Sequence, residues 1–200
     1  MAKLTTKSVK QFISDLKSEK PTPGGGSAAA LTASLGASLI LMVVQINGRR
    51  LKIKKEKQVS SRLSAAVSKL IPQITEIIDE DAVVYSKVSK QYSLYYKAKT
   101  EGKRKAAKVL LEQYLIAAFH VQASLALLCV LALRVNHELF DISSGAIQND
   151  LKVSRSLLKA AFEGAISTCE VNWKYVEDKT QKKILSTEMK KLKRELKAVL

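Results

Sequence analysis

The sequence predicts an all-α protein, an up-and-down bundle of about six helices in which two helices rich in small residues are fully buried. Only three prolines and eight glycines interrupt 200 residues. Apolar residues recur at spacings of three and four, the period of an amphipathic helix, and no strand alternation or solenoid repeat competes with this pattern. Because 46% of the residues are hydrophobic, we expect residues 1–200 to form a single domain around one core.

The first expected helix is short and ends before the turn PTPGGGSAAA at residues 21–30. Proline fixes φ and glycine alone reaches positive φ without strain, so this segment is typical of a tightly specified turn, not of a flexible linker. We expect Ser27 to be the N-cap of the second helix, after three glycines that expose backbone N–H groups. A helix start of that kind favours an anion. The apolar stripe of the first helix consists of Val9, Phe12, Ile13 and Leu16.

The remaining helices are expected from the same periodicity and from the turn residues between them. The second helix is expected at about 27–47, with an interruption at Gly48-Arg49-Arg50. The third runs from the basic stretch 52–56 to Lys97, with Pro72 as a kink or break, and the fourth from 101–102 to about Leu139. Asp150 opens the fifth after the loop 143–149, this helix ends near Tyr175, and a charged sixth helix follows.

Two long segments carry no charged residue, 21–48 and 114–133. Each is long enough to cross a bilayer, and a membrane pair is one interpretation. Helices buried inside a bundle have the same composition, and small residues let such helices approach closely. We expect buried helices and no membrane, with His120 as a core histidine.

The composition restricts partners and compartment. Thirty-four Lys and Arg against 18 Asp and Glu give a net charge of +16, which favours an anionic partner. Aromatic residues make up only 6%, too few for extensive base stacking, so nucleic acid is a weak alternative. Cys129 and Cys169 lie far apart without a CxxC or a histidine at metal spacing, which predicts buried free thiols and no metal. The N-terminus lacks a secretory pattern, so we expect a cytoplasmic protein.

Four segments in order carry a family resemblance. They are PTPGGGSAAAL at 21–31, GRR at 48–50, DEDAVVY at 79–85, and NDLKV at 149–153 leading to Gly164-Ala165 and Asn172. Together they resemble the glycine loop, the GRR, the DxDAxAF/Y and the SDxxVA…GA…NVxxN segments of the cyclodeaminase/cyclohydrolase family of tetrahydrofolate metabolism. The resemblance covers about residues 9–178.

The resemblance implies an all-helical homodimer that handles the carbon bridging N5 and N10 of tetrahydrofolate. In the cyclodeaminase reaction N10 attacks a formimino carbon on N5 and ammonia leaves, giving the 5,10-methenyl cation. In the cyclohydrolase reaction water opens that cation. Neither reaction needs a cofactor beyond the folate substrate. The net charge would suit a polyglutamylated folate, although lysine-rich helix faces that are merely solvated would give the same number.

The matched motifs also suggest site residues. Asp81 and Tyr85 are four apart and share a helix face, and a carboxylate set against an apolar stripe has a raised pKa suited to acid–base work. The alternative is a solvated helix carboxylate. The expected set is catalytic Asp81 and Lys54, with substrate contacts from Pro23, Gly24, Gly25, Gly26, Ser27, Arg49, Arg50, Tyr85, Asp150 and Asn172.

Several of these residues have a structural alternative. Asp150 is either a helix N-cap or a ligand contact. Asn172 either holds neighbouring backbone or binds folate. Arg49 and Arg50 either bind a carboxylate or complement the dipole of a helix end.

The chain also departs from the family pattern. Thr168-Cys169 replaces Asn-Val, Asn149 replaces serine, Gln122 stands where proline is expected, and Lys54 falls near a histidine proposed as proton donor. A lysine donates a proton near neutral pH only if its pKa is depressed. The resemblance predicts formiminotetrahydrofolate cyclodeaminase activity, with hydrolysis of the methenyl cation as an alternative. The departures motivate a second alternative, folate binding without turnover.

Overall fold

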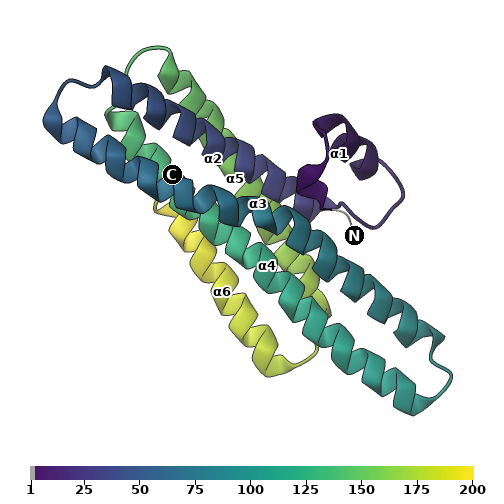
Figure 1. The fold of residues 1–200 in the computed structure, drawn as a ribbon. Helices are drawn as coiled ribbons and strands as arrows, with labels where there is room; N and C mark the ends of the chain where they lie inside the picture. Colours follow the sequence, from purple (N-terminus) through teal and green to yellow (C-terminus); the bar gives the residue numbers. More distant parts are fainter. Residues whose placement is uncertain (1–2) are drawn as a thin grey trace.

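The computed structural model describes residues 3–200, which form an elongated bundle of helices with no strand in that range (Figure 1). The all-α prediction is therefore confirmed. The elements are η1 (Leu4–Thr6), α1 (Val9–Leu16), α2 (Gly25–Arg50), α3 (Lys54–Lys97), α4 (Glu101–Asp141), α5 (Ile147–Tyr175) and α6 (Lys179–Lys197).

Helices α2, α3, α4 and α5 run up and down around one core, each packed against the next, with α5 returning to α2. Successive neighbours joined by short loops are the simplest way to bury one apolar stripe from each helix. Helix α6 lies along α4 and α5, and α1 stands beside the start of α2 (Figure 1).

Two expected interruptions are absent from the helices. Helix α2 continues through Gly48, Arg49 and Arg50, and the N–H of Leu51 still donates to the carbonyl of Asn47 at 2.9 Å. One glycine costs a helix only about 1 kcal/mol, which the packed turns before it outweigh. Pro72 lies inside α3 without ending it. Its side chain is exposed, so the hydrogen bond it removes is on the solvent side.

Two predicted N-caps are also wrong. Helix α2 begins at Gly25 with Gly24 in the N-cap position, so Ser27 lies in the first turn and points inward. Helix α5 begins at Ile147 after Ala146, which places Asp150 within the first turn, where a carboxylate still complements the helix dipole.

Small residues bring α2 and α5 close together. The hydroxyl of Ser154 donates to the carbonyl of Gly36 at 2.8 Å, and a Cβ on Gly36 would lie 2.9 Å from Leu158. By length and composition α2 and α4 could each cross a membrane, but 56% and 61% of their most apolar windows are buried in the bundle. Both are core helices, yet neither is buried on all sides, because α2 leaves Leu35 53% exposed and α4 leaves Leu127 40% exposed.

Three other expectations have mixed outcomes. Only Phe12 of the α1 stripe is buried, and Val9, Ile13 and Leu16 are exposed. The prediction of a core position for His120 is wrong, since its half-exposed ring lies 3.6 Å from the carboxylate of Glu188. Cys129 and Cys169 are free and buried, as predicted.

Candidate functional site

A buried carboxylate in the middle of α3 is the centre of the candidate site. Asp81 is 8% exposed and faces the first turn of α2. The Ser27 hydroxyl lies 2.9 Å from Oδ2 of Asp81, and Nε2 of Gln122 donates to Oδ1 at 2.7 Å. Helices α2, α3 and α4 thus each supply one side chain of a hydrogen-bonded cluster, which we call the Asp81 cluster: Ser27, Asp81 and Gln122.

Gly26 is required next to this cluster because there is no room for a side chain. A Cβ on Gly26 would lie 2.1 Å from Oδ1 of Asp81 and 2.3 Å from Nε2 of Gln122. The backbone at Gly26 is ordinary helix, so the requirement comes from close approach and not from φ. The second glycine of the helix therefore lets the carboxyl group press against the backbone of α2.

The buried environment of Asp81 perturbs its carboxyl group. Burial raises the pKa of its carboxyl group above the usual 3.8, and hydrogen bonds from Ser27 and Gln122 oppose part of that rise. The direction agrees with the expectation from sequence. A carboxyl group whose pKa moves up towards neutrality exchanges protons more readily at physiological pH than a solvated aspartate.

Sequence reasoning did not identify Gln122 as part of the site. It was considered only as a departure from an expected proline, but its side chain is fully buried and bonds directly to Asp81. Its other amide atom, Oε1, has no hydrogen-bond partner among the described residues. A buried amide within an apolar helix was the signal, because such a group needs a polar partner.

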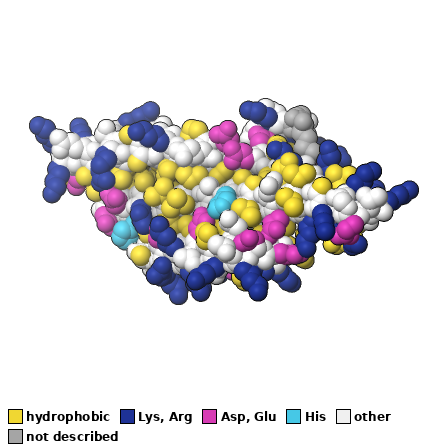
Figure 2. All heavy atoms as spheres, turned by 90° about the horizontal axis from the view of Figure 1, so that it is seen from below, with side chains coloured by type: hydrophobic (Ala, Val, Ile, Leu, Met, Phe, Trp, Pro, Cys, Tyr) yellow, Lys and Arg dark blue, Asp and Glu magenta, His cyan; other side chains and the backbone are white. Residues whose placement is uncertain are grey.

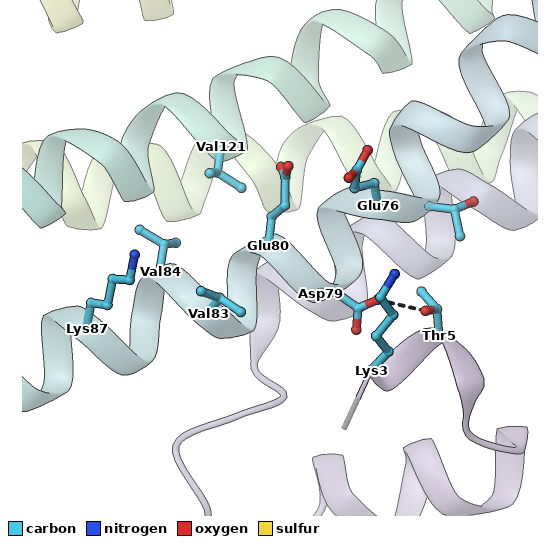
Figure 3. Close-up of a pocket in the computed structure, with 10 residues that line it drawn as sticks. Lys3, Thr5, Glu76, Asp79, Glu80, Val83, Val84, Lys87 and Val121 are labelled. Atoms are coloured by element: carbon cyan, nitrogen blue, oxygen red, sulfur yellow. Dashed lines mark hydrogen bonds between the residues drawn. The ribbon is translucent and has the colours of Figure 1, made fainter. Parts of the chain in front are cut away.

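Two pockets border α3 next to the cluster. The larger, about 560 Å³, is lined by Glu76 and Glu80 of α3 and by Val121 of α4 (Figure 3). On its opposite rim Asp79 accepts hydrogen bonds from the N–H of Leu4 and the hydroxyl of Thr5, which fastens η1 to α3. Asp79 therefore has a structural task, and it faces away from the Asp81 cluster.

The second pocket, about 480 Å³, lies between the glycine turn, η1 and α3. Its walls include Pro21, Thr22 and Ala82, the last being the neighbour of Asp81 in sequence. Asp81 lines neither pocket. The basic residues of this second pocket are Lys3, Lys7 and Lys20, with Asp15 bound to Lys7.

Further predicted residues lie at the same end of the bundle. Pro23 and Gly26 are buried, whereas Gly25 is exposed at the start of α2. Tyr85 is one helical turn beyond Asp81 and 45% exposed. Asn172 is buried on α5, two turns beyond Gly164, whose backbone packs on Ala29 of α2.

The remaining predicted residues lie at the opposite end of the bundle. Arg49 and Arg50 are about 35 Å from Gly26 along α2, and Lys54 is about 40 Å from Asp81 along α3. Asp150 follows the loop that Asn47 holds through a 2.7 Å hydrogen bond to Ser143. A single chain therefore does not bring these four residues to the Asp81 cluster.

Within residues 3–200, no group of three or more His, Cys, Asp or Glu side chains lies close enough together to bind a metal ion. The described chemistry of the cluster is that of a carboxyl group, a hydroxyl group and an amide.

Sequence comparisons relate the chain to known proteins. Residues 8–191 match the sequence model of the formiminotransferase-cyclodeaminase family. The chain is 29% identical over 186 residues to formimidoyltransferase-cyclodeaminase of Gallus gallus, covering 88% of this chain and 32% of that protein. It is 30% identical over 102 residues to methenyltetrahydrofolate cyclohydrolase of Methylorubrum extorquens, covering 50% of this chain and 49% of that protein.

The fold is also similar to a solved structure. Formiminotetrahydrofolate cyclodeaminase of Thermotoga maritima superposes with a TM-score of 0.76 at 19% identity, over 98% of this chain and 93% of that chain. This likeness concerns the fold alone. In length, the chain spans 32% of the Gallus gallus protein and 49% of the cyclohydrolase.

Proposed function

Because the chain belongs to the formiminotransferase-cyclodeaminase family, we propose that it is a tetrahydrofolate enzyme that cyclises 5-formimino-tetrahydrofolate to 5,10-methenyl-tetrahydrofolate with release of ammonia. The observation that carries the proposal is the Asp81 cluster. Burial of a carboxyl group costs stability even where two side chains from two other helices hold it, so its presence favours a functional task.

The task is proton transfer. When N10 attacks the formimino carbon, a C–N bond forms and N10 loses a proton. When ammonia leaves, the old C–N bond breaks and the departing nitrogen gains a proton. Asp81 as carboxylate accepts the proton from N10 and as carboxylic acid returns it to the departing nitrogen, so one group serves both steps. The positive charge of the methenyl cation comes from a formimino group that is protonated at the start.

Hydrolysis of the methenyl cation is the second candidate, favoured by the similarity to the Methylorubrum extorquens cyclohydrolase. There Asp81 would take a proton from the attacking water. The cyclisation is the main proposal because the longer alignment, over 186 residues, is with a formimidoyltransferase-cyclodeaminase.

Folate would be bound at the glycine turn. The exposed N–H of Gly25 opens a helix of 26 residues with no acidic residue in its first turn, which favours an anionic group. The pocket beside it carries Lys3, Lys7 and Lys20 against Asp15 and Asp79, and this excess of positive charge would attract the glutamate tail of a polyglutamylated folate. On one face of the molecule, further Lys and Arg gather at both ends around an apolar band (Figure 2).

We further propose that the active form is a cytoplasmic homodimer. Buried free thiols suit a reducing compartment. The exposed stripe of α2 is free of charge and includes Leu35, Ser38 and Met42, near the middle of that helix. Two copies of α2 packed antiparallel about this midpoint would set Arg49 of one copy level with Gly26 of the other. Such an arrangement would join the two separated groups of predicted residues.

The experiment on function follows the absorbance of the 5,10-methenyl cation. Its appearance from 5-formimino-tetrahydrofolate supports cyclodeamination, and its accelerated loss supports hydrolysis. Tight folate binding with neither change would select the non-catalytic alternative. If wild-type protein does neither and binds no folate, the proposal fails.

A mixing experiment tests the dimer. Asp81→Asn and the double variant Arg49→Ala/Arg50→Ala are each expected to be inactive. If the site joins two subunits, coexpression of both variants restores about a quarter of wild-type activity, because half of the dimers then hold one intact site. No recovery, or a monomer by light scattering, would contradict the dimer.

A further inference from the structure

The hydroxyl group of Ser27 lies between two oxygen atoms that both accept hydrogen bonds. It is 2.9 Å from Oδ2 of Asp81 and 3.0 Å from the carbonyl oxygen of Ile78. Ser27 is fully buried, so water does not compete for its hydrogen atom. A hydroxyl group has one hydrogen to donate and two lone pairs to accept with, so it donates to only one of these oxygens at a time.

With Asp81 ionised, both carboxylate oxygens and the Ser27 hydroxyl group have hydrogen-bond partners, whereas Oε1 of Gln122 has none among the described residues. The Ser27 hydroxyl donates to Oδ2, the Ser27 backbone N–H also donates to the carboxylate, and Gln122 donates to Oδ1. The carbonyl of Ile78 is not left unpaired, because it lies inside α3 and also accepts a bond within the helix.

With Asp81 protonated, the same heavy-atom positions still serve, although a hydrogen bond to the neutral carboxyl group is weaker than one to the carboxylate. The carboxylic acid donates from Oδ2 to the oxygen of Ser27, and the Ser27 hydrogen turns to the carbonyl of Ile78 at 3.0 Å. Gln122 continues to donate to Oδ1. The change of protonation state therefore requires the rotation of one O–H bond and no movement of a side chain.

We propose that Ser27 is a positioning residue that allows Asp81 to gain and lose a proton within a rigid, buried site, and that Gln122 holds the carboxyl group in place meanwhile. This role deepens the function proposed above and rests on it for its use in catalysis. It assigns the Ser27 side chain to Asp81 and not to folate, since both hydrogen-bonding directions of the hydroxyl are used inside the protein. Preorganisation of this kind lowers the cost of moving a proton at the moment of reaction.

The test substitutes Ser27 with alanine and follows kcat/KM against pH. Loss of the hydroxyl removes a donor to the ionised carboxylate and so raises the pKa of Asp81. The pH below which half of the activity is lost, on the acid side of the profile, should therefore rise by about one unit or more. The matched control is Ser34→Ala. Ser34 is a nearly buried serine two turns along α2, whose hydroxyl lies 3.3 Å from that of Thr75 and does not reach Asp81. Its pH profile should coincide with that of the wild type.

A second readout does not depend on turnover. The side-chain carboxyl carbon of Asp81, assigned by its absence in Asp81→Asn, is titrated by NMR in wild type, Ser27→Ala and Ser34→Ala. The same upward shift is expected in Ser27→Ala only. If that shift is found in a protein without folate turnover, the proposed function fails while the role of Ser27 stands.

Two results would overturn the role of Ser27. One is a folded Ser27→Ala protein whose Asp81 titrates as in the wild type. The other comes from an NMR titration of the wild type alone, so it can be measured even if Ser27→Ala does not fold. The Cα chemical shifts of the first turn of α2 and of α3 around Ile78 should stay constant while Asp81 titrates. Large changes there would mean that the helices rearrange.

Discussion

Substitution of Gly26 by alanine tests the close approach on which the Asp81 cluster depends. The added Cβ would lie 2.1 Å from Oδ1 of Asp81, whereas real Cβ contacts essentially never fall below 3.0 Å. The carboxyl group must therefore move by about 1 Å, and Gln122 must move with it. Both side chains are buried, so neither has free space to enter.

The expected cost combines three terms. Overpacking of a filled site costs about 1–3 kcal/mol, and disturbed hydrogen bonds to a charged group cost about 1.5–3 kcal/mol. Alanine returns up to about 1 kcal/mol because it is the better helix former. We expect a net loss of about 2 kcal/mol in the free energy of unfolding, which lowers Tm by about 4–8 °C for a chain of this size. A 1 Å displacement of the catalytic carboxyl should also lower kcat by about 100-fold.

Gly25→Ala is the matched control, because a Cβ at Gly25 meets nothing within 4 Å. This variant should keep a Tm equal to or slightly above that of the wild type, which makes it the control for stability. Urea unfolding, thermal unfolding and the methenyl absorbance assay are measured on both variants. A Gly26→Ala protein with wild-type Tm and wild-type rate would refute the reasoning.

Three further predictions use other features of the chain. Because the folded-state pKa of Asp81 is raised above its unfolded value, the folded protein binds this proton more tightly, and the stabilisation is lost as the pH rises through the raised pKa. Asp81→Asn should therefore gain stability relative to wild type in urea unfolding as the pH rises above about 4. An identical pH dependence of the two proteins would contradict the raised pKa. Burial raises the pKa of the Cys129 and Cys169 thiols to about 12. A thiol reagent at about pH 8 should therefore label neither cysteine in the native protein and both in urea. Rapid labelling of the native protein would show that the core is open to solvent. Pro72→Ala should restore one backbone hydrogen bond on the exposed side of α3. The free energy of unfolding, measured by urea titration, should rise by about 1–3 kcal/mol. A loss of stability would mean that the proline ring makes stabilising contacts of its own.

Much of the fold follows from local sequence signals. The 3.6-residue periodicity and the scarcity of proline and glycine predicted the helices, and the uncharged segments predicted the core helices α2 and α4. Asp81 was identified through the resemblance of residues 79–85 to the DxDAxAF/Y segment, and the apolar stripe around it supported that assignment. The periodicity and the uncharged segments can be read within a single helix, without knowledge of its neighbours.

The errors concern features that depend on distant contacts. Gly25 and Gly26 became helical, and Ser27 lost the N-cap position, because α3 and α4 lie against that turn. Gln122 bonds to a residue 41 positions away, which no pattern within α4 reveals. His120 follows the buried Phe119, but one residue along a helix rotates the side chain by about 100°, which was enough to place it at the surface.

The most direct measurement of the central claim is the rate at which 5,10-methenyl absorbance appears from 5-formimino-tetrahydrofolate, in wild type and in Asp81→Asn. The account predicts a wild-type rate that falls by about 100-fold or more in the variant, with the fold retained. Equal rates in the two proteins would contradict the assignment of Asp81 as the group that moves the proton.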